Sequence, residues 1–109
     1  MYTVDLHQKN ETVQTAAYNL NESIKLARKS RDHVICFIVG YGSTGGTHKI
    51  KSRVLELLEE LKNKNQIKDY IAGNEMYIFN SKYLNLKGRE VLDREKIHSS
   101  NPGQIFVIL

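Results

Sequence analysis

The stretch that decides the fold is VICFIVGYGSTGG, residues 34–46. Its first part, residues 34–39, is a continuous apolar run that ends in glycine, which is typical of a strand buried in the core. Four of the chain's seven glycines then fall within seven residues, at Gly40, Gly42, Gly45 and Gly46. The next segment has helical periodicity, so the sequence predicts a buried strand, a glycine-rich loop and a helix in that order.

The glycine-rich loop has the features of an anion-binding site. Glycine lets the backbone adopt positive φ and approach a ligand closely, while the N-terminus of the following helix presents unpaired N–H groups and the positive end of its dipole. Phosphate is the ligand that we expect there. The residues of this predicted site are the loop and the first cations of the helix: Gly40, Tyr41, Gly42, Ser43, Thr44, Gly45, Gly46, Thr47, Lys49, Lys51 and Arg53.

The order of charges in the helix after the loop is the reverse of what helix stability alone favours. Stability favours acids in the first turn and cations in the last turn, but here Lys49, Lys51 and Arg53 come first and the acids begin at Glu56. A bound polyanion would offset the roughly 0.3–1 kcal/mol forgone at each placement. The alternative, that these are ordinary solvated charges on a helix face, stays open.

Length and composition predict one globular domain. The chain has 109 residues, of which 40% are hydrophobic and 26% charged, as in ordinary soluble domains. Its longest apolar run, residues 34–39, is far shorter than the roughly 20 residues of a membrane helix, and the N-terminus lacks a secretory signal pattern. We expect a single domain over residues 1–109, a cytoplasmic location and no membrane partner. The net charge of +4 fits either an acidic partner such as nucleic acid or ordinary solubility.

Disulfide and metal chemistry have little support in the sequence. The single cysteine, Cys36, lies inside the apolar run and is interpreted as an inert core residue. The four histidines, at positions 7, 33, 48 and 98, show no paired spacing on one helix face, so no metal site is predicted. We expect no resident cofactor, and a Mg²⁺ or Mn²⁺ ion that took part in catalysis would be weakly held.

The remaining patterns complete an α/β fold. Strand patterns occur at residues 2–7, 34–39, 67–71, 75–79 and 104–109, and amphipathic helices are predicted at residues 12–29 and 47–63. Residues 80–103 are polar with only short helical patterns, and we expect a mobile excursion there. The order predicts a two-layer β-α-β-α-β-β sandwich with a mixed sheet of about four strands, the first two parallel through a right-handed crossover.

Asp5 and His7 are the candidate catalytic residues because they close the first strand. The carboxyl ends of parallel strands meet at one edge of the sheet, where ligands of α/β folds bind. Being two positions apart, the two side chains project to the same side, with about 7 Å between their α-carbons. An imidazole beside a phosphate can transfer protons near neutral pH, and the carboxylate can orient it, stabilise its charged form or help to bind a cation. A purely structural pair stays open.

Several short motifs, taken in order, resemble the Smr (small MutS-related) domain family. They are Val4-Asp5-Leu6-His7, Thr12-Val13 at the start of a helix, Gly40-Tyr41-Gly42-Ser43 after an apolar strand, and Asn101-Pro102-Gly103 before a terminal apolar strand. The resemblance spans the whole chain and implies a two-layer α/β domain similar to the C-terminal domain of translation initiation factor three. Such domains stand alone or are fused to mismatch-repair-like ATPases, and we expect a stand-alone member here. It also implies binding to nucleic acid, with nicking endonuclease activity on DNA or, in some members, cleavage of RNA.

The chain departs from the family pattern at one important position. The family's histidine-glycine-x-glycine motif falls on residues 39–42, where Val39 stands at the histidine, and Gln8 stands where many members have glycine. His48 or His98 would have to substitute for the missing imidazole. The resemblance therefore leaves two functions open: hydrolysis of a phosphodiester bond, or binding of nucleic acid without cleavage.

Tyr41 and the glycine spacing each allow more than one interpretation. Tyr41 is expected either to stack on a base or sugar from the loop crest or to fold back onto the core. The spacing Gly40-x-Gly42-x-x-Gly45 also matches a dinucleotide-binding pattern, but it follows the second strand and the chain has too few strands for that fold. A P-loop is excluded because Gly46 stands where its lysine would be.

Overall fold

The computed structural model describes residues 1–8, 11–40 and 45–109, with the side chains of residues 45–48 excepted. The strands are β1 (Tyr2–Asp5), β2 (Val34–Ile38), β3 (Asp69–Ala72) and β4 (Gln104–Ile108), and the helices are α1 (Val13–Lys29), α2 (Gly45–Asn63), the 3₁₀ turn η1 (Gly73–Glu75), α3 (Ser81–Leu84) and α4 (Arg89–Arg94). None of the helices within these ranges is long and apolar enough to span a bilayer.

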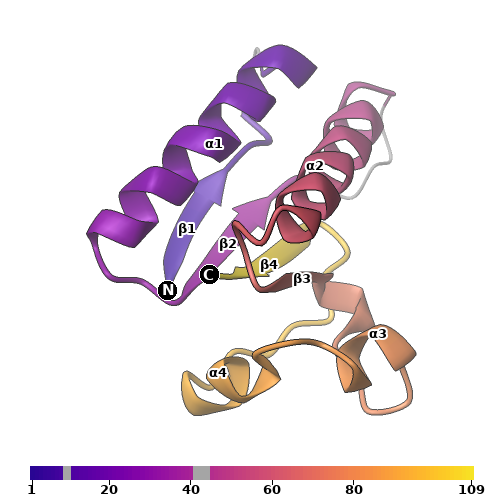
Figure 1. Cartoon of the computed structure of the whole chain (residues 1–109). Coiled ribbons are helices and arrows are strands. Elements are labelled where there is room, and N and C mark those ends of the chain that lie inside the picture. The colour runs from indigo at the N-terminus through magenta and orange to yellow at the C-terminus, as the bar shows by residue number, and fades with distance from the viewer. Residues whose placement is uncertain (9–10, 41–44) are drawn as a thin grey trace.

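The four strands form one mixed sheet in the order β1-β2-β4-β3 (Figure 1). β1 and β2 are parallel, while β4 runs antiparallel to both β2 and β3. The predicted α/β class and the four-stranded mixed sheet are therefore confirmed. β4, the last strand, lies in the interior of the sheet. Both of its faces are covered there, which suits its run of apolar residues.

α1 and α2 lie side by side on one face of the sheet (Figure 1). α1 begins with a capping box, in which Thr12 Oγ1 accepts from the backbone N–H of Thr15 at 3.1 Å and Thr15 Oγ1 accepts from that of Thr12 at 2.8 Å. Such a cap contributes about 1 kcal/mol. Arg31, with φ of 61°, then turns the chain out of the helix toward β2.

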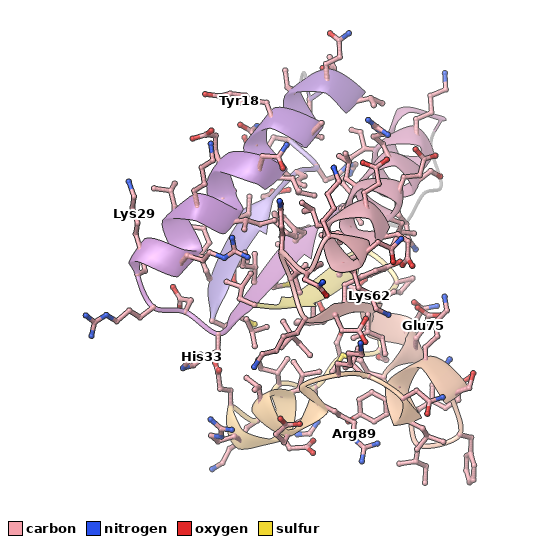
Figure 2. All side chains as sticks on the ribbon, viewed as in Figure 1. Tyr18, Lys29, His33, Lys62, Glu75 and Arg89 are labelled. Carbon is pink, nitrogen blue, oxygen red and sulfur yellow. The ribbon has the colours of Figure 1, made fainter. Side chains whose placement is uncertain are left out.

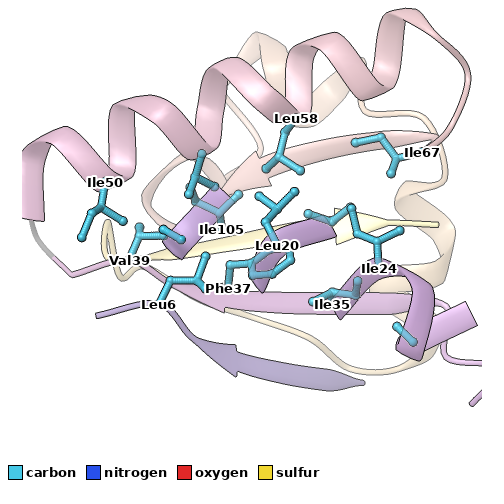
Figure 3. Close-up of a cluster of buried hydrophobic side chains, with 14 residues drawn as sticks. Leu6, Leu20, Ile24, Ile35, Phe37, Val39, Ile50, Leu58, Ile67 and Ile105 are labelled. Atoms are coloured by element: carbon cyan, nitrogen blue, oxygen red, sulfur yellow. The ribbon is translucent and has the colours of Figure 1, made fainter. Parts of the chain in front are cut away.

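The main core fills the space between these helices and the sheet (Figure 3). Ile35 and Phe37 of β2 and Ile105 of β4 are fully buried against Leu20 of α1 and Leu58 of α2. Each such side chain contributes roughly 1.5–3 kcal/mol through burial. The alternation of residues in β2 thus sends one half of its side chains into this core and the other half to the opposite face.

The opposite face of the sheet is covered by the segment that contains α3 and α4 (Figures 1 and 2). Its buried apolar residues pack against side chains of β2, β3 and β4. The residues contributed by this segment are Leu86, Val91, Leu92 and Ile97. These residues are irregularly spaced, so the sequence pattern, which favoured a polar excursion over residues 80–103, does not reveal this packing.

The expected extended segment at residues 75–79 is wrong. The chain instead enters η1 directly after β3 and then turns, with the backbone N–H of Asn80 donating to the carbonyl of Tyr77 at 3.0 Å. No neighbouring strand is available to residues 75–79, since the far side of β3 is an edge of the sheet as described. Alternating apolar residues without a strand partner do not make a strand.

Cys36 lies on the face of the sheet that α3 and α4 cover. It is 1% exposed, and its burial raises the pKa of the thiol to about 11. The thiol therefore stays protonated at neutral pH, which agrees with its interpretation as a core residue.

Candidate functional site

Three backbone segments meet at one edge of the sheet. The N–H of Leu6, just after β1, donates to the carbonyl of Ile38 at 2.8 Å, and the N–H of Val39 donates to the carbonyl of Gly103 at 2.7 Å. The carboxyl ends of β1 and β2 and the amino end of β4 therefore lie side by side. This is the meeting of strand ends that the sequence predicted for β1 and β2.

Asp5 and His7 occupy this edge on the face of the sheet opposite α1 and α2. Leu6 between them is fully buried in the main core, and Tyr2 and Val4 pack partly against that core, so the predicted inward face of β1 is confirmed. Both candidate side chains are exposed. Asp5 Oδ1 accepts a hydrogen bond from the backbone N–H of His7 at 2.7 Å, which fixes the direction in which the chain leaves β1.

The turn before β4 packs closely against the start of the glycine-rich loop. Gly40 has φ of 76°, and a β-carbon on Gly103 would lie 2.9 Å from both the carbonyl carbon and the oxygen of Gly40. Asn101 Oδ1 accepts from the N–H of Gly103 at 2.7 Å, and Ser99 Oγ donates to Gln104 Oε1 at 2.7 Å. The sequence pattern marks this turn only as the entry to the last strand. Its Asn-Pro-Gly pattern was the available signal, but the contact with Gly40 is visible only in the fold.

We expect Gly103→Ala to destabilise the protein by roughly 1–3 kcal/mol, because backbone atoms of Gly40 must shift to admit the methyl group. Urea unfolding followed by circular dichroism measures this change. The control is Ser100→Ala, an exposed change in the same turn, which should stay within about 0.5 kcal/mol of wild type. Equal stability of the two variants would contradict the close packing of the turn on the loop.

The glycine-rich loop leads directly into α2. Gly45, Gly46 and Thr47 form the first residues of this helix, whose first turn holds no acid. Tyr41, Gly42, Ser43 and Thr44 lie outside the described residues, as do the side chains of Thr47 and His48, so their roles stay predictions.

The three predicted phosphate-binding cations differ in their surroundings. Lys49 is exposed about one turn into α2, while Lys51 and Arg53 are half-buried. Arg53 Nη1 lies 3.0 Å from Glu56 Oε2, so part of its charge is compensated. Neither Lys49 nor Lys51 forms an ion pair with an acid in the described part of the chain. These two lysines are the stronger candidates to bind an anion.

Residue 39, where the resembled motif has its histidine, is a valine packed among apolar side chains. Val39 is fully buried in the main core, together with Ile50 and Val54 of α2. His98 is exposed and lines a groove of about 320 Å³ with Gln104 on the same face of the sheet as Asp5. Gln104 pairs with Ile38, which pairs with Asp5, so Asp5 and Gln104 are separated by two strand spacings, about 10 Å.

The residues present fit a divalent cation only if the substrate brings most of its ligands. Among the described residues, no three His, Cys, Asp or Glu side chains gather as a metal site. Mg²⁺ usually binds through one or two carboxylates together with substrate phosphates. Asp5 can supply one such carboxylate, so an ion here would be held mainly by substrate and water.

Comparison with known proteins supports the fold. No protein-family model matches the sequence, and no curated protein matches it significantly. The chain is similar to a solved structure described as the crystal structure of the Smr domain of Thermus thermophilus MutS2, with a TM-score of 0.62 and 16% sequence identity. The alignment covers 100% of this chain and 98% of that chain. The chain therefore has the fold of an Smr domain, which is the fold that its sequence motifs implied.

Proposed function

We propose that this chain is a nucleic-acid-binding domain that holds the sugar-phosphate backbone at the edge where β1 and β2 end. The observation that carries the proposal is the position of an acid-free helix start beside that edge: α2 begins directly after the glycine-rich loop, and its first side chains with charge are cations. Helix N-termini bind phosphate through unpaired N–H groups and the helix dipole. The Smr fold supports the same conclusion.

In this proposal the lysines of α2 set affinity rather than sequence preference. Lys49 and Lys51 would contact phosphates, which fix the position of the strand and carry no base information. The loop would approach the backbone closely because its glycines have no side chains. Binding should therefore be salt-dependent and tolerant of sequence, on DNA or RNA.

We further propose that the site hydrolyses a phosphodiester bond, with His7 as the proton-transfer group. The bond from phosphorus to the leaving oxygen breaks as a bond to an attacking oxygen forms. His7 takes the proton of the attacking oxygen or gives a proton to the leaving oxygen, and Asp5 fixes the backbone that carries it. A divalent cation, where present, would neutralise charge on the phosphate.

A binding module without catalysis is the second candidate function. The burial of Val39 in the core favours it, because the imidazole that the family places there has no counterpart at this position. One proton-transfer group would then have to act without a partner imidazole. The two candidates agree on binding and differ only in cleavage.

Binding is tested by the double substitution Lys49→Gln and Lys51→Gln. We expect it to weaken binding to a short DNA duplex on the order of tenfold and to lower the slope of log affinity against log salt by about 2, since each phosphate contact contributes about 0.9. Fluorescence anisotropy over a range of salt concentrations measures both quantities.

The matched control removes the same charge from α1 by Lys25→Gln and Lys29→Gln, which should change affinity less than about twofold because these charges lie outside the proposed site. An equal loss in the control, or binding that does not respond to salt, would overturn the proposed interface.

A further inference from the structure

A second basic site lies at the end of the sheet opposite the candidate functional site. A cavity of about 410 Å³ is lined by four basic residues and by no Asp or Glu, and its acidic group is the terminal carboxylate of Leu109, which also lines it. Its position is set by the ends of β2 and β4, because the N–H of Leu109 donates to the carbonyl of His33 just before β2. The residues that line the cavity are Arg28, Lys62, Asn65, Gln66, Ile67, Lys68, Lys87 and Leu109.

The four cations come from four separate parts of the chain. Arg28 and Lys62 lie in the last turns of α1 and α2, where a cation compensates the negative end of the helix dipole. That explanation does not cover the other two. Lys68 precedes β3 and Lys87 precedes α4, so neither lies in a helix. Helix stability alone therefore does not explain why these side chains gather at one cavity.

The backbone beneath the two non-helical lysines is held in place. The N–H of Lys68 donates to the carbonyl of Ile108 at 2.8 Å, and the N–H of Lys87 donates to Asp69 Oδ2 at 3.0 Å. Gly88 has φ of 79°, and a β-carbon there would lie 2.8 Å from Ile108 Cγ2. Both lysines thus extend from backbone that is packed against the end of β4, so the points from which their side chains leave the fold are fixed.

Three of the four positive charges have no acidic partner in the protein as described. Lys62 Nζ lies 3.1 Å from Asp69 Oδ1. Arg28, Lys68 and Lys87 form no ion pair with any described residue. Like charges around one cavity repel each other, and an anion bound among them relieves this repulsion.

We propose that this cavity binds a small phosphate-bearing anion, with Arg28, Lys68 and Lys87 as its positive ligands. Arginine pairs with phosphate through two parallel N–H donors, and lysine adds point charges. The volume of about 410 Å³ lies in the range of roughly 300–1,000 Å³ that small-ligand pockets occupy. Asn65 and Gln66 also line the cavity and supply amide groups.

The cavity is separate from the proposed nucleic-acid interface. Between Lys51 and Lys62, the outer surface of α2 carries the exposed acids Glu56, Glu59 and Glu60. These carboxylates repel a phosphate backbone, so they interrupt a continuous track from one basic region to the other. The ligand of the cavity is therefore a small molecule rather than a further stretch of the same nucleic acid.

The test is a titration of the protein with pyrophosphate, followed through the backbone amide NMR shifts of Ile67 and Gly88, which flank the two lysines. We expect saturable shifts in wild type. Lys68→Gln with Lys87→Gln should weaken the affinity at least tenfold while keeping both backbone hydrogen bonds. The control, Lys29→Gln with Lys64→Gln, removes the same charge from exposed positions at the same end of the molecule and should change it less than twofold.

Two outcomes would overturn the proposal. One is the absence of saturable shifts at millimolar pyrophosphate, and the other is an equal loss of affinity in the control pair, which would mean attraction to net charge alone. Lys49→Gln with Lys51→Gln should leave the shifts at Ile67 and Gly88 intact, and their loss there would also count against the cavity. A failure of nucleic-acid binding would leave this result unaffected.

Discussion

His7→Ala is expected to slow phosphodiester cleavage by roughly 10²–10⁴-fold and to leave nucleic-acid affinity within about twofold, because general acid–base catalysis contributes a factor of that size and binding rests on other residues. The imidazole is exposed at the edge where β1 ends, so its removal leaves the buried core intact. Single-turnover cleavage of supercoiled plasmid and of structured RNA, with and without Mn²⁺, measures the rate.

The matched control is His33→Ala, which removes another exposed imidazole, just before β2 at the opposite end of the sheet. It should cleave at the wild-type rate. Cleavage by the His7→Ala protein as fast as by wild type would exclude His7 as the proton-transfer group. A wild-type protein that binds nucleic acid and cleaves neither substrate would instead identify the chain as the non-catalytic module.

The burial of Val39 decides how much catalysis to expect from wild type. In this chain the end of β2 contributes a methyl-bearing side chain to the core and no second imidazole to the edge. Hydrolysis needs one proton to be removed and another to be delivered. His7 can carry out one of these transfers, and water must then carry out the other, unless His98 reaches the substrate across the sheet. The rate of the wild-type protein is therefore expected to fall below that of a site with two imidazoles.

The features that sequence predicted best are those encoded in short contiguous patterns. The continuous apolar run of β2 indicates a strand buried in the core, and the alternation in β1 indicates a strand with one buried face. A parallel pair of strands places their carboxyl ends together. From these patterns follow the positions of Leu6 in the core and of Asp5 at the edge. The N-cap of α1 is also a local pattern: the sequence leaves Asn10 or Thr12 open as the cap, and in the structure Thr12 is the N-cap.

The features that sequence missed depend on contacts between distant segments. Leu86 and Ile97 cover the second face of the sheet, yet their spacing has no helical or strand period. The basic cavity joins Arg28 to Lys87, which are remote in sequence, and the position of Lys62 in the last turn of α2 has a sufficient local explanation in the helix dipole. The close packing of Gly103 against Gly40 was missed for the same reason, because a turn motif does not indicate which distant segment packs on it.

Asp69 shows how one buried polar residue links these distant segments. It is 5% exposed, and Oδ1 accepts from the N–H of Tyr70 at 2.9 Å while Oδ2 accepts from that of Lys87 at 3.0 Å. Its carboxylate also pairs with Lys62 Nζ at 3.1 Å. Asp69 thereby joins the edge strand β3 to the end of α2 and to the chain that enters α4.

Asp69→Ala is therefore expected to destabilise the protein by roughly 2–6 kcal/mol, because two backbone N–H groups lose their acceptor at about 1–3 kcal/mol each. The loss of the Lys62 pair adds little, since that lysine is partly exposed and such pairs are worth about 0–1 kcal/mol. Urea unfolding measures the change. Glu75→Ala, which breaks the pair between the half-buried Glu75 and the exposed Lys82 close to β3, is the control and should cost less than about 1 kcal/mol. If the two variants are equally stable, the backbone hydrogen bonds of Asp69 do not hold the second layer to the sheet, and the packing of Leu92 and its neighbours must do so alone.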